Sequence, residues 1–485
     1  MKNLVRFLKG SEKYVAMIVV LLFIQAYCDL ALPNYTSDLL NIGLQQNGIE
    51  NAAPETIRDN TLKKLSYFMD DKDVSKVDAA YGRANGKGVR KLKKDVDIKK
   101  ISDIMMLPEG VLYQMENAPS PEFKLSDIEM AIDSGMMTKE QFLSQINEKI
   151  ESFGKFSNKY LNQIAVSFVA SEYKAQGVKI SKIQNRYLLE IGLKMMLVTL
   201  LMSVAAVITG LFASRTSAKI GMDLREQIFD KVMKFTNKEM EQFSTASLIT
   251  RSTNDIQQIQ MVVVLFLRLI AYAPILAIFG IIRVVQTRSG MSWIIVLAVI
   301  ILSAALGILM AVAMPKFKKM QVLVDKLNLV SREILTGVMP IRAFNREKHE
   351  EKRFEKANWN LYRTQLFTNR TMTFMMPIMM LVMNGVSVLI VWVGAKKVDL
   401  GTIQVGDLTA FITYSMMIVM SFLMLSMISI LLPRAGVAAN RIVEVLETPV
   451  SLLDPETAMD DELGEVKGRV VFKDVEFSYP DAEKP

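Results

Sequence analysis

The chain has 485 residues, of which 51% are hydrophobic and 22% are charged, and its mean hydropathy is +0.25. It is too apolar for an ordinary soluble protein and too charged to lie wholly within a membrane, so membrane spans joined by solvated segments are expected. The net charge of +8 accumulates beside apolar runs, which argues against a nucleic-acid partner. The single Cys28 and the single His349 exclude an intrachain disulfide, a cysteine-ligated metal site and a histidine-based triad.

The amino-terminal segment is predicted to lie on and then cross the membrane. Residues 1–13 mix apolar and basic side chains, a pattern typical of a short amphipathic helix on the inner membrane face. The apolar run 14–32 is long enough to span a bilayer, and Pro33 is expected to end it. A cleavable signal peptide is the alternative, and it is disfavoured because no small-residue cleavage site follows.

A long polar insertion, 34–186, follows the first span and is predicted to form a small, mainly helical domain outside the membrane. Ser126 and Thr138 each begin a capping-box pattern that marks a helix start. The stretch Asp70–Lys100 is dense in charge and contains glycine, so we expect a mobile loop there.

Five further apolar runs are predicted to span the membrane. They are residues 187–213, 262–285, 293–314, 372–394 and 408–432. Basic residues outnumber acidic ones in 316–370 and in 1–13, so the positive-inside rule places both termini and both long polar stretches between spans in the cytoplasm. The expected fold is therefore an all-α, multi-pass membrane domain, residues 1–433, in a plasma membrane.

The carboxyl-terminal part reads differently from the membrane domain. Residues 434–465 are predicted to begin as a helix and to continue as an acidic, proline-containing linker. In 466–485, apolar residues alternate in two short runs, which predicts strands that open a new domain. About 20 residues cannot form a folded domain, so the sequence is expected to stop inside one.

Four motifs in this order resemble those of a known family. The first is carried by Phe243, Leu248, Arg251, Thr253, Asn254, Asp255 and Ile259, and the second by residues between Arg332 and Asn358, including Phe344 and Glu347. The third is Ala439, Arg441, Ile442 and Glu444, and the fourth is Val470–Pro480. With these motifs the chain resembles an ABC (ATP-binding cassette) exporter half-transporter of the multidrug type, similar to subunits of bacterial heterodimeric exporters, with its nucleotide-binding domain truncated after the first strand. Ser244 and Ser247 depart from the aspartate and glycine usual in the first motif.

The resemblance implies roles for particular residues. Short coupling helices near Asn237–Ser247 and Phe344–Glu355 would dock on nucleotide-binding domains. The residues implied in this coupling are Phe243, Leu248, Arg251, Asn254, Asp255, Phe344 and Glu347. Tyr479 would stack on the adenine of ATP, which the full-length protein would bind with Mg²⁺. The chain contains no G-x4-G-K-[ST] phosphate-binding loop, so it is assigned no catalytic residue and is not expected to hydrolyse ATP alone.

The expected function is ATP-driven export of amphiphilic small molecules by alternating access, with a second half-subunit as partner, a different chain being favoured over a second copy. Flexible methionines suit varied apolar ligands, and a polar group inside a span is costly and often functional. The cavity candidates are Asn384, Met376, Met380, Met383, Met420 and Met424. Alternatives are a peptide or lipid exporter of the same family and, from another class, a membrane sensor whose outer domain binds a ligand.

Overall fold

The computed structural model describes residues 6–8, 10–86, 88–117, 130, 134, 138–143, 158–287, 289–452 and 468–476, without the side chains of 158–160, 426–431 and 433. Within these residues, six helical segments are long and apolar enough to cross a membrane: Glu12–Gln45, Ile180–Met233, Thr245–Gln286, Ser292–Thr336, Glu347–Asp399 and Val405–Leu425. Five of the six expected spans fall inside one of these segments, and the sixth, 408–432, begins in Val405–Leu425 and lies within the longer helix α18 (Val405–Glu447). The prediction of an all-α, multi-pass membrane fold is confirmed.

The chain divides into two compact units. The larger comprises Leu8–Ser217 and Met261–Pro433, and the smaller comprises Met1–Phe7, Ala218–Gln260 and Arg434–Pro485. Three helices contribute residues to both units: α9 (Ile180–Met233), α12 (Ile256–Leu265) and α18 (Val405–Glu447).

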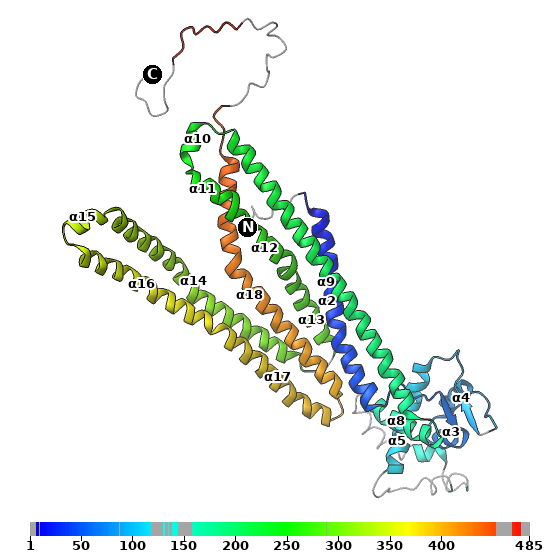
Figure 1. Ribbon diagram of the computed structural model, residues 1–485. Coiled ribbons are helices and arrows are strands. Elements are labelled where there is room, and N and C mark those ends of the chain that lie inside the picture. The colour runs from blue at the N-terminus through cyan, green and yellow to red at the C-terminus, as the bar shows by residue number, and fades with distance from the viewer. Residues whose placement is uncertain are drawn as a thin grey trace. The chain divides into compact units, whose positions relative to one another are not determined.

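The membrane helices of the larger unit pack in two sets. In the first, α2 (Glu12–Asp38) lies against α13 (Tyr272–Gln286), and in the second, α14 (Ser292–Thr336) lies against α16 (Glu347–Thr373) and α17 (Met375–Asp399) (Figure 1). Many of their large apolar side chains remain exposed in the single chain, as expected for surfaces that face lipid or a partner.

Pro33 does not end the first helix, contrary to the sequence expectation. Helix α2 runs through Pro33 to Asp38 and continues as the π-helical segment η1 (Leu39–Gln45). Proline removes one helical hydrogen bond, but neighbouring helices can offset that loss in a membrane span. Pro33 is buried, which is consistent with packing having kept the helix continuous.

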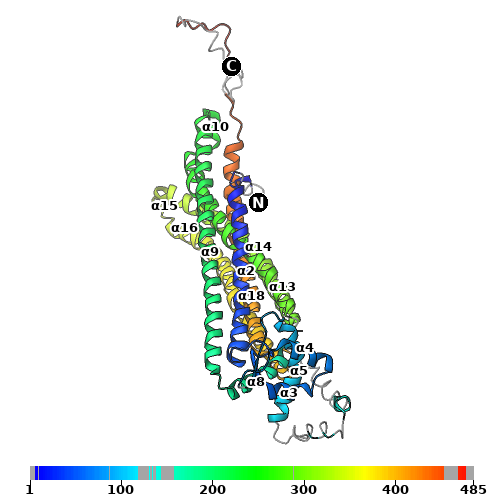
Figure 2. The same ribbon diagram turned by 90° about the vertical axis from the view of Figure 1, so that its right-hand side faces the viewer.

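The insertion forms a small helical body beyond the η1 end of α2 (Figure 2). Its elements are β1 (Thr56–Arg58), α3 (Asp59–Ser66), α4 (Asp71–Ala80), β2 (Val89–Lys91), α5 (Ile98–Asn117) and α8 (Asn158–Ala175). Strands β1 and β2 pair antiparallel, with Ile57 opposite Arg90. Fully buried Ile57, Leu65, Met105 and Leu112 lie in its core.

Two sequence predictions within the insertion have opposite outcomes. The capping box at Thr138 is confirmed: Thr138 N donates to Gln141 Oε1 (3.1 Å), and Gln141 N donates to Thr138 Oγ1 (3.3 Å). The prediction of a mobile loop at Asp70–Lys100 is wrong, because this stretch contains α4 and β2. A few apolar residues, such as Val77 and Tyr81, are buried in the core. Their burial orders a segment whose charged composition had predicted a mobile loop. Ser126 lies outside the described residues.

The smaller unit consists mainly of a helical turn and a helix end. The end of α9 leads into α10 (Asn237–Gln242), α11 (Thr245–Thr250), the π-helical segment η2 (Arg251–Asp255) and the start of α12. The last turns of α18 belong to the same unit and end at Glu447, as the sequence predicted.

The second polar turn, in the larger unit, joins α14 to α16 through α15 (Val338–Ala343). A short helix was expected near Phe344–Glu355, but residues from Glu347 onward belong to the long helix α16. Gly337 closes α14, and Pro340 lies in the first turn of α15, where its missing N–H costs no helical hydrogen bond. The short helix of this turn is therefore α15, which ends at Ala343, immediately before the expected segment begins.

The strands expected in 466–485 are not formed in the described part of that segment. Residues 468–476 contain no strand, and Val470, Phe472 and Val475 are strongly exposed. A strand is stable only when neighbouring strands complete its hydrogen bonds, and within the described residues nothing pairs with this segment.

Candidate functional site

The first polar turn, which comprises α10, α11 and η2 (Asn237–Asp255), is fixed locally by two helix caps. Thr236 and Glu239 form a capping box at the start of α10, in which Thr236 N donates to Glu239 Oε2 (2.8 Å). Hydrogen bonding from the Thr236 side chain and from Ser451 lowers the pKa of Glu239 to about 2. Ser244 caps α11 by accepting from Ser247 N (3.2 Å). The serine that departs from the family pattern therefore still starts this helix.

Arg251 is the most connected side chain of this turn. Its Nη1 donates to the main-chain oxygen of Arg441 (2.8 Å) and lies 2.9 Å from Glu444 Oε2, while its Nε donates to Ser247 Oγ (3.2 Å). Its guanidinium lies 4.8 Å from the centre of the Phe243 ring. That ring is 6% exposed and stacks on Phe235.

The other residues of the first motif divide between two faces. Leu248 and Asp255 are buried, and Asp255 Oδ1 lies 3.9 Å from Arg441 Nη1. Asn254 is exposed. Arg251 and Asp255 thus face the end of α18 in the same unit. Arg441 and Glu444 were quoted as part of the third motif but were not predicted as site residues. Their opposite charges three residues apart were the available signal.

The second polar turn carries an open hollow. It is lined by Ser331, Ile334, Leu335, Val338, Ile341, Arg342, Glu347, Glu350, Glu351 and Phe354. Glu347 is the first residue of α16 and lines this hollow, whereas Phe344 lies in the α15–α16 turn and is 78% exposed. Among these predicted coupling residues, the structure therefore places Glu347 at a concave surface and Phe344 on an exposed tip.

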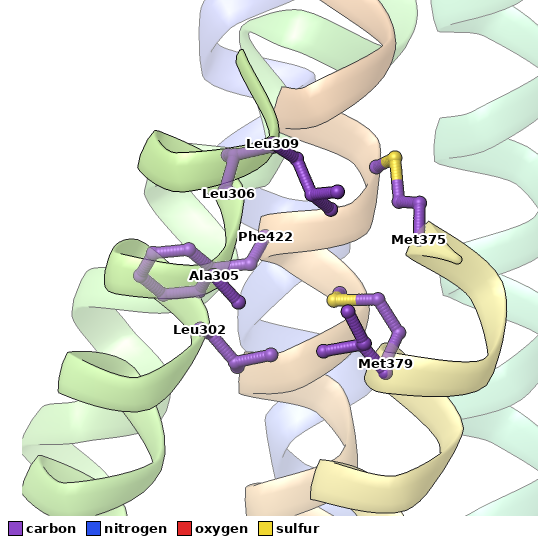
Figure 3. Close-up of a pocket in the computed structure, with 8 residues that line it drawn as sticks. Leu302, Ala305, Leu306, Leu309, Met375, Met379 and Phe422 are labelled. Carbon is purple, nitrogen blue, oxygen red and sulfur yellow. The ribbon is translucent and has the colours of Figure 1, made fainter. Parts of the chain in front are cut away.

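An apolar pocket lies among α14, α17 and α18 (Figure 3). It is lined by Leu302, Ala305, Leu306, Leu309, Met375, Ile378, Met379 and Phe422. Leu302, Ala305, Leu306 and Leu309 come from α14, opposite Met375 and Met379 of α17. Thioether and branched aliphatic side chains form a surface that adapts to apolar ligands of varied shape.

The predicted cavity residues do not line this pocket. Met376, Met380 and Asn384 recur every four residues along an exposed face of α17, different from the face of Met375 and Met379. Met420 is exposed, and Met383 and Met424 are half-buried. The sequence identified methionine-rich helices, but the helical phase decided which methionines reach the pocket.

Sequence reasoning missed a polar pair inside the spans. The Tyr272 hydroxyl of α13 donates to Asp29 of α2. An acidic side chain in an otherwise apolar run is costly unless paired, and this was the signal that could have found it. Another pair lies on α9, where Lys194 Nζ is 2.8 Å from Glu190 Oε1, four residues earlier on the same helix.

Tyr479, predicted to stack on adenine, lies outside the described residues. Among the described residues, no group of three or more histidine, cysteine or acidic side chains could hold a metal ion. The candidate functional features of the described residues are two polar helical turns and an apolar pocket among spans.

Long helices that pass from apolar spans into structured polar turns, with an apolar pocket between spans, define a helical membrane protein of the transporter class. Residues 141–422, more than half of the chain, match the family described as ABC transporter transmembrane region. The chain belongs to this family, and its resemblance to an ABC exporter half-transporter is confirmed.

Curated relatives agree with this family. The chain is 36% identical to an uncharacterized ABC transporter ATP-binding protein of Mycobacterium tuberculosis (strain ATCC 25618 / H37Rv), over 63% of this chain and 52% of that protein. It is 31% identical to the uncharacterized ABC transporter ATP-binding protein YfiB of Bacillus subtilis (strain 168), over 60% and 50%. An ATP-dependent lipid A-core flippase of Aromatoleum aromaticum is 24% identical, over 56% and 44%. The chain thus spans about half the length of the curated relatives it matches.

Proposed function

We propose that this chain is the membrane-spanning part of an ATP-driven exporter that moves amphiphilic small molecules out across the plasma membrane by alternating access. It would work with a second half-transporter, a different chain being favoured, and with nucleotide-binding domains that bind ATP and Mg²⁺. Both termini and both polar turns would lie in the cytoplasm, where the excess of basic residues favours them.

The observation that carries this proposal is the length of the helices. Helix α14 has 45 residues and α9 has 54. At 1.5 Å per residue they extend roughly 70 and 80 Å, more than twice the ~30 Å hydrocarbon core of a bilayer. A rigid helix that begins in a span and ends in a distant polar turn transmits displacement without chemistry of its own.

The apolar pocket has a free volume of only about 10 Å³, so an amphiphilic substrate would enter it as the lining side chains repack. All the side chains that line it are apolar, and both methionines can repack. The family match favours a transporter over the sensor alternative, because it covers four of the six expected spans whole, part of a fifth, and both polar turns.

The test is ATP-dependent uptake of an amphiphilic dye by inside-out vesicles that contain this chain joined to a nucleotide-binding domain, together with a candidate second half-transporter. Ala305→Trp fills the pocket and is expected to lower dye uptake at least about tenfold, since overpacking a bound site displaces the ligand. Ala304→Trp is the matched control, because Ala304 is exposed on a different face of α14. Equal effects of the two substitutions would show that the pocket is not the dye site.

A lipid substrate is the second candidate, favoured by the flippase relative at low identity. The same vesicles would then flip a fluorescent phospholipid while leaving a non-lipid dye untouched. Translocation of the lipid alone would replace the small-molecule assignment.

A further inference from the structure

The strongest unexplained feature is the charge arrangement where the first polar turn meets the end of α18 within the smaller unit. Four charged side chains alternate in sign across this contact: Arg251 and Asp255 on η2, and Glu444 and Arg441 on α18. Arg251 pairs with Glu444, and Asp255 with Arg441, so the later residue of one helix meets the earlier residue of the other. This register is the one that two antiparallel helices produce.

Burial distinguishes this contact from ordinary surface ion pairs. The side chains of Arg251 and Asp255 are only 12% and 6% exposed, whereas those of Glu444 and Arg441 are 60% and 54% exposed. One carboxylate oxygen of Asp255 is buried without a hydrogen-bond partner in the described part of the chain. Charged groups that fold into the turn cost desolvation, and contacts to α18 are what offsets that cost.

Apolar residues next to the charged ones are buried on both elements. Ile256 and Ile259 are fully buried beside the charged segment, as are Ala439, Ile442 and Val445 on α18. Arg251 adds a hydrogen bond to the main chain of α18, which fixes position as well as charge. The turn and the helix end are therefore joined by ion pairs and by a directional hydrogen bond, and each contributes buried apolar residues next to the charged ones.

The same end of α18 is tied at two further points. Arg6 Nη1 lies 2.7 Å from Glu447 Oε1, and the hydroxyls of Thr236 and Ser451 lie 3.1 Å apart. The exposed side chains of the turn, such as Ile249 and Asn254, remain free to meet another domain. The exposed residues of the turn that could contact another domain are thus different from the residues that contact α18.

We propose that Arg251 and Asp255, with Glu444 and Arg441, form a crossed charge clamp that makes the first polar turn and the end of α18 move as one body, and that Arg251 and Asp255 are positioning residues rather than docking residues. The proposal rests on the exporter function for its role in transport. In that role, a force on the turn is passed directly to the last membrane helix.

Charge reversal tests the clamp in the full chain with its second half-transporter. Arg251→Glu and Glu444→Arg are each expected to lower maximal dye uptake on the order of tenfold, while the KM for ATP stays unchanged because the clamp does not touch nucleotide. The double variant, Arg251→Glu with Glu444→Arg, is expected to recover part of the uptake, because the swap restores the charge pair but not the hydrogen bond that Arg251 donates to the main chain of Arg441. Lys234→Glu makes the same charge change as Arg251→Glu at an exposed position and is expected to be neutral.

Hydrogen exchange tests the clamp independently of transport. Hydrogen exchange at the end of α18 is expected to rise at least about tenfold in each single reversal and to return in the double variant. Restored exchange without any ATP-dependent transport would retain the clamp and remove the exporter function. Failure of the double variant to restore either readout, or single reversals that match wild type, would overturn the clamp.

Discussion

Two glutamates in the insertion show how much a residue's environment decides. Glu172 is 2% exposed, and it accepts from Arg58 Nη2 (2.7 Å), Thr61 Oγ1 (2.9 Å) and Gln176 Nε2 (2.8 Å). Burial would raise the pKa of Glu172, but these hydrogen bonds, led by Arg58, lower it overall. Glu109 is fully buried, and neither of its carboxyl oxygens has a partner among the described residues. Burial, and then repulsion from Glu172, raise the pKa of Glu109 well above its usual range.

We predict that Glu109→Gln makes the insertion less sensitive to alkaline pH. Because the folded state holds the Glu109 proton, its stability is greatest below the ordinary glutamate pKa and falls by about 1.4 kcal/mol per pH unit as pH rises toward the raised pKa. The amide cannot ionise, so this slope should vanish. Thermal unfolding or hydrogen exchange of the insertion in the full chain, between about pH 5 and about pH 9, measures it.

Glu116→Gln on the same helix is the control for that prediction. Glu116 is exposed on α5, so its amide variant should keep the wild-type pH slope. A wild-type slope in Glu109→Gln as well would mean that another group carries the pH dependence.

At the level of elements, close backbone contacts hold the start of α18 against the end of α2 and η1. Asn41 on η1 accepts from Gly406 N (2.7 Å) and donates to Ser37 Oγ (3.2 Å), and Ser37 in turn donates to Asp407 (3.1 Å). A Cβ at position 406 would lie 2.5 Å from the main-chain oxygen of Ser37. The start of α18 can approach α2 this closely only with glycine.

We therefore predict that Gly406→Ala destabilises the larger unit by about 1–3 kcal/mol, the usual cost of overpacking. Gly385→Ala is the matched control, because a Cβ there meets nothing within 4 Å in the middle of α17. Alanine should even favour that helix by up to about 1 kcal/mol. Thermal unfolding of the two variants in detergent compares them, and equal melting temperatures would contradict the contact at Gly406.

The two prolines Pro33 and Pro340 show how far helix ends could be predicted from the sequence. Pro33 and Pro340 carry the same local signal, yet α2 continues through Pro33 while α15 begins around Pro340. The difference lies in surroundings: Pro33 is buried within a packed helix, and Pro340 follows a helix closed at Gly337. The apolar runs identified which helices could span a membrane, but packing decided where each helix ended.

At the level of the whole molecule, the proposed topology separates the insertion from the two polar turns by a membrane. The insertion and the polar turns each contain exposed positions, and the single native cysteine, Cys28, is buried. Replacing it by serine gives a background in which one introduced cysteine reports one side of the membrane.

We predict that a membrane-impermeant maleimide labels Ser75→Cys on intact cells but not Thr245→Cys or Lys348→Cys. All three positions are exposed in the structure, so only the membrane should distinguish them. Permeabilised cells provide the control, in which all three should react. Labelling of Thr245→Cys or Lys348→Cys on intact cells would reverse the orientation inferred from basic residues.

The sequence by itself determined the class of this protein. Apolar runs of span length, basic residues beside them and four ordered motifs are local patterns, and local patterns suffice to specify six membrane helices and an ABC transporter family. Tertiary structure decided which side chains act together. Met375 rather than Met376 reaches the pocket, Asp29 meets Tyr272 from another span, and Arg251 turns to Glu444, almost two hundred residues away in the chain. Such contacts depend on helical phase and on packing between distant segments, which no local pattern encodes.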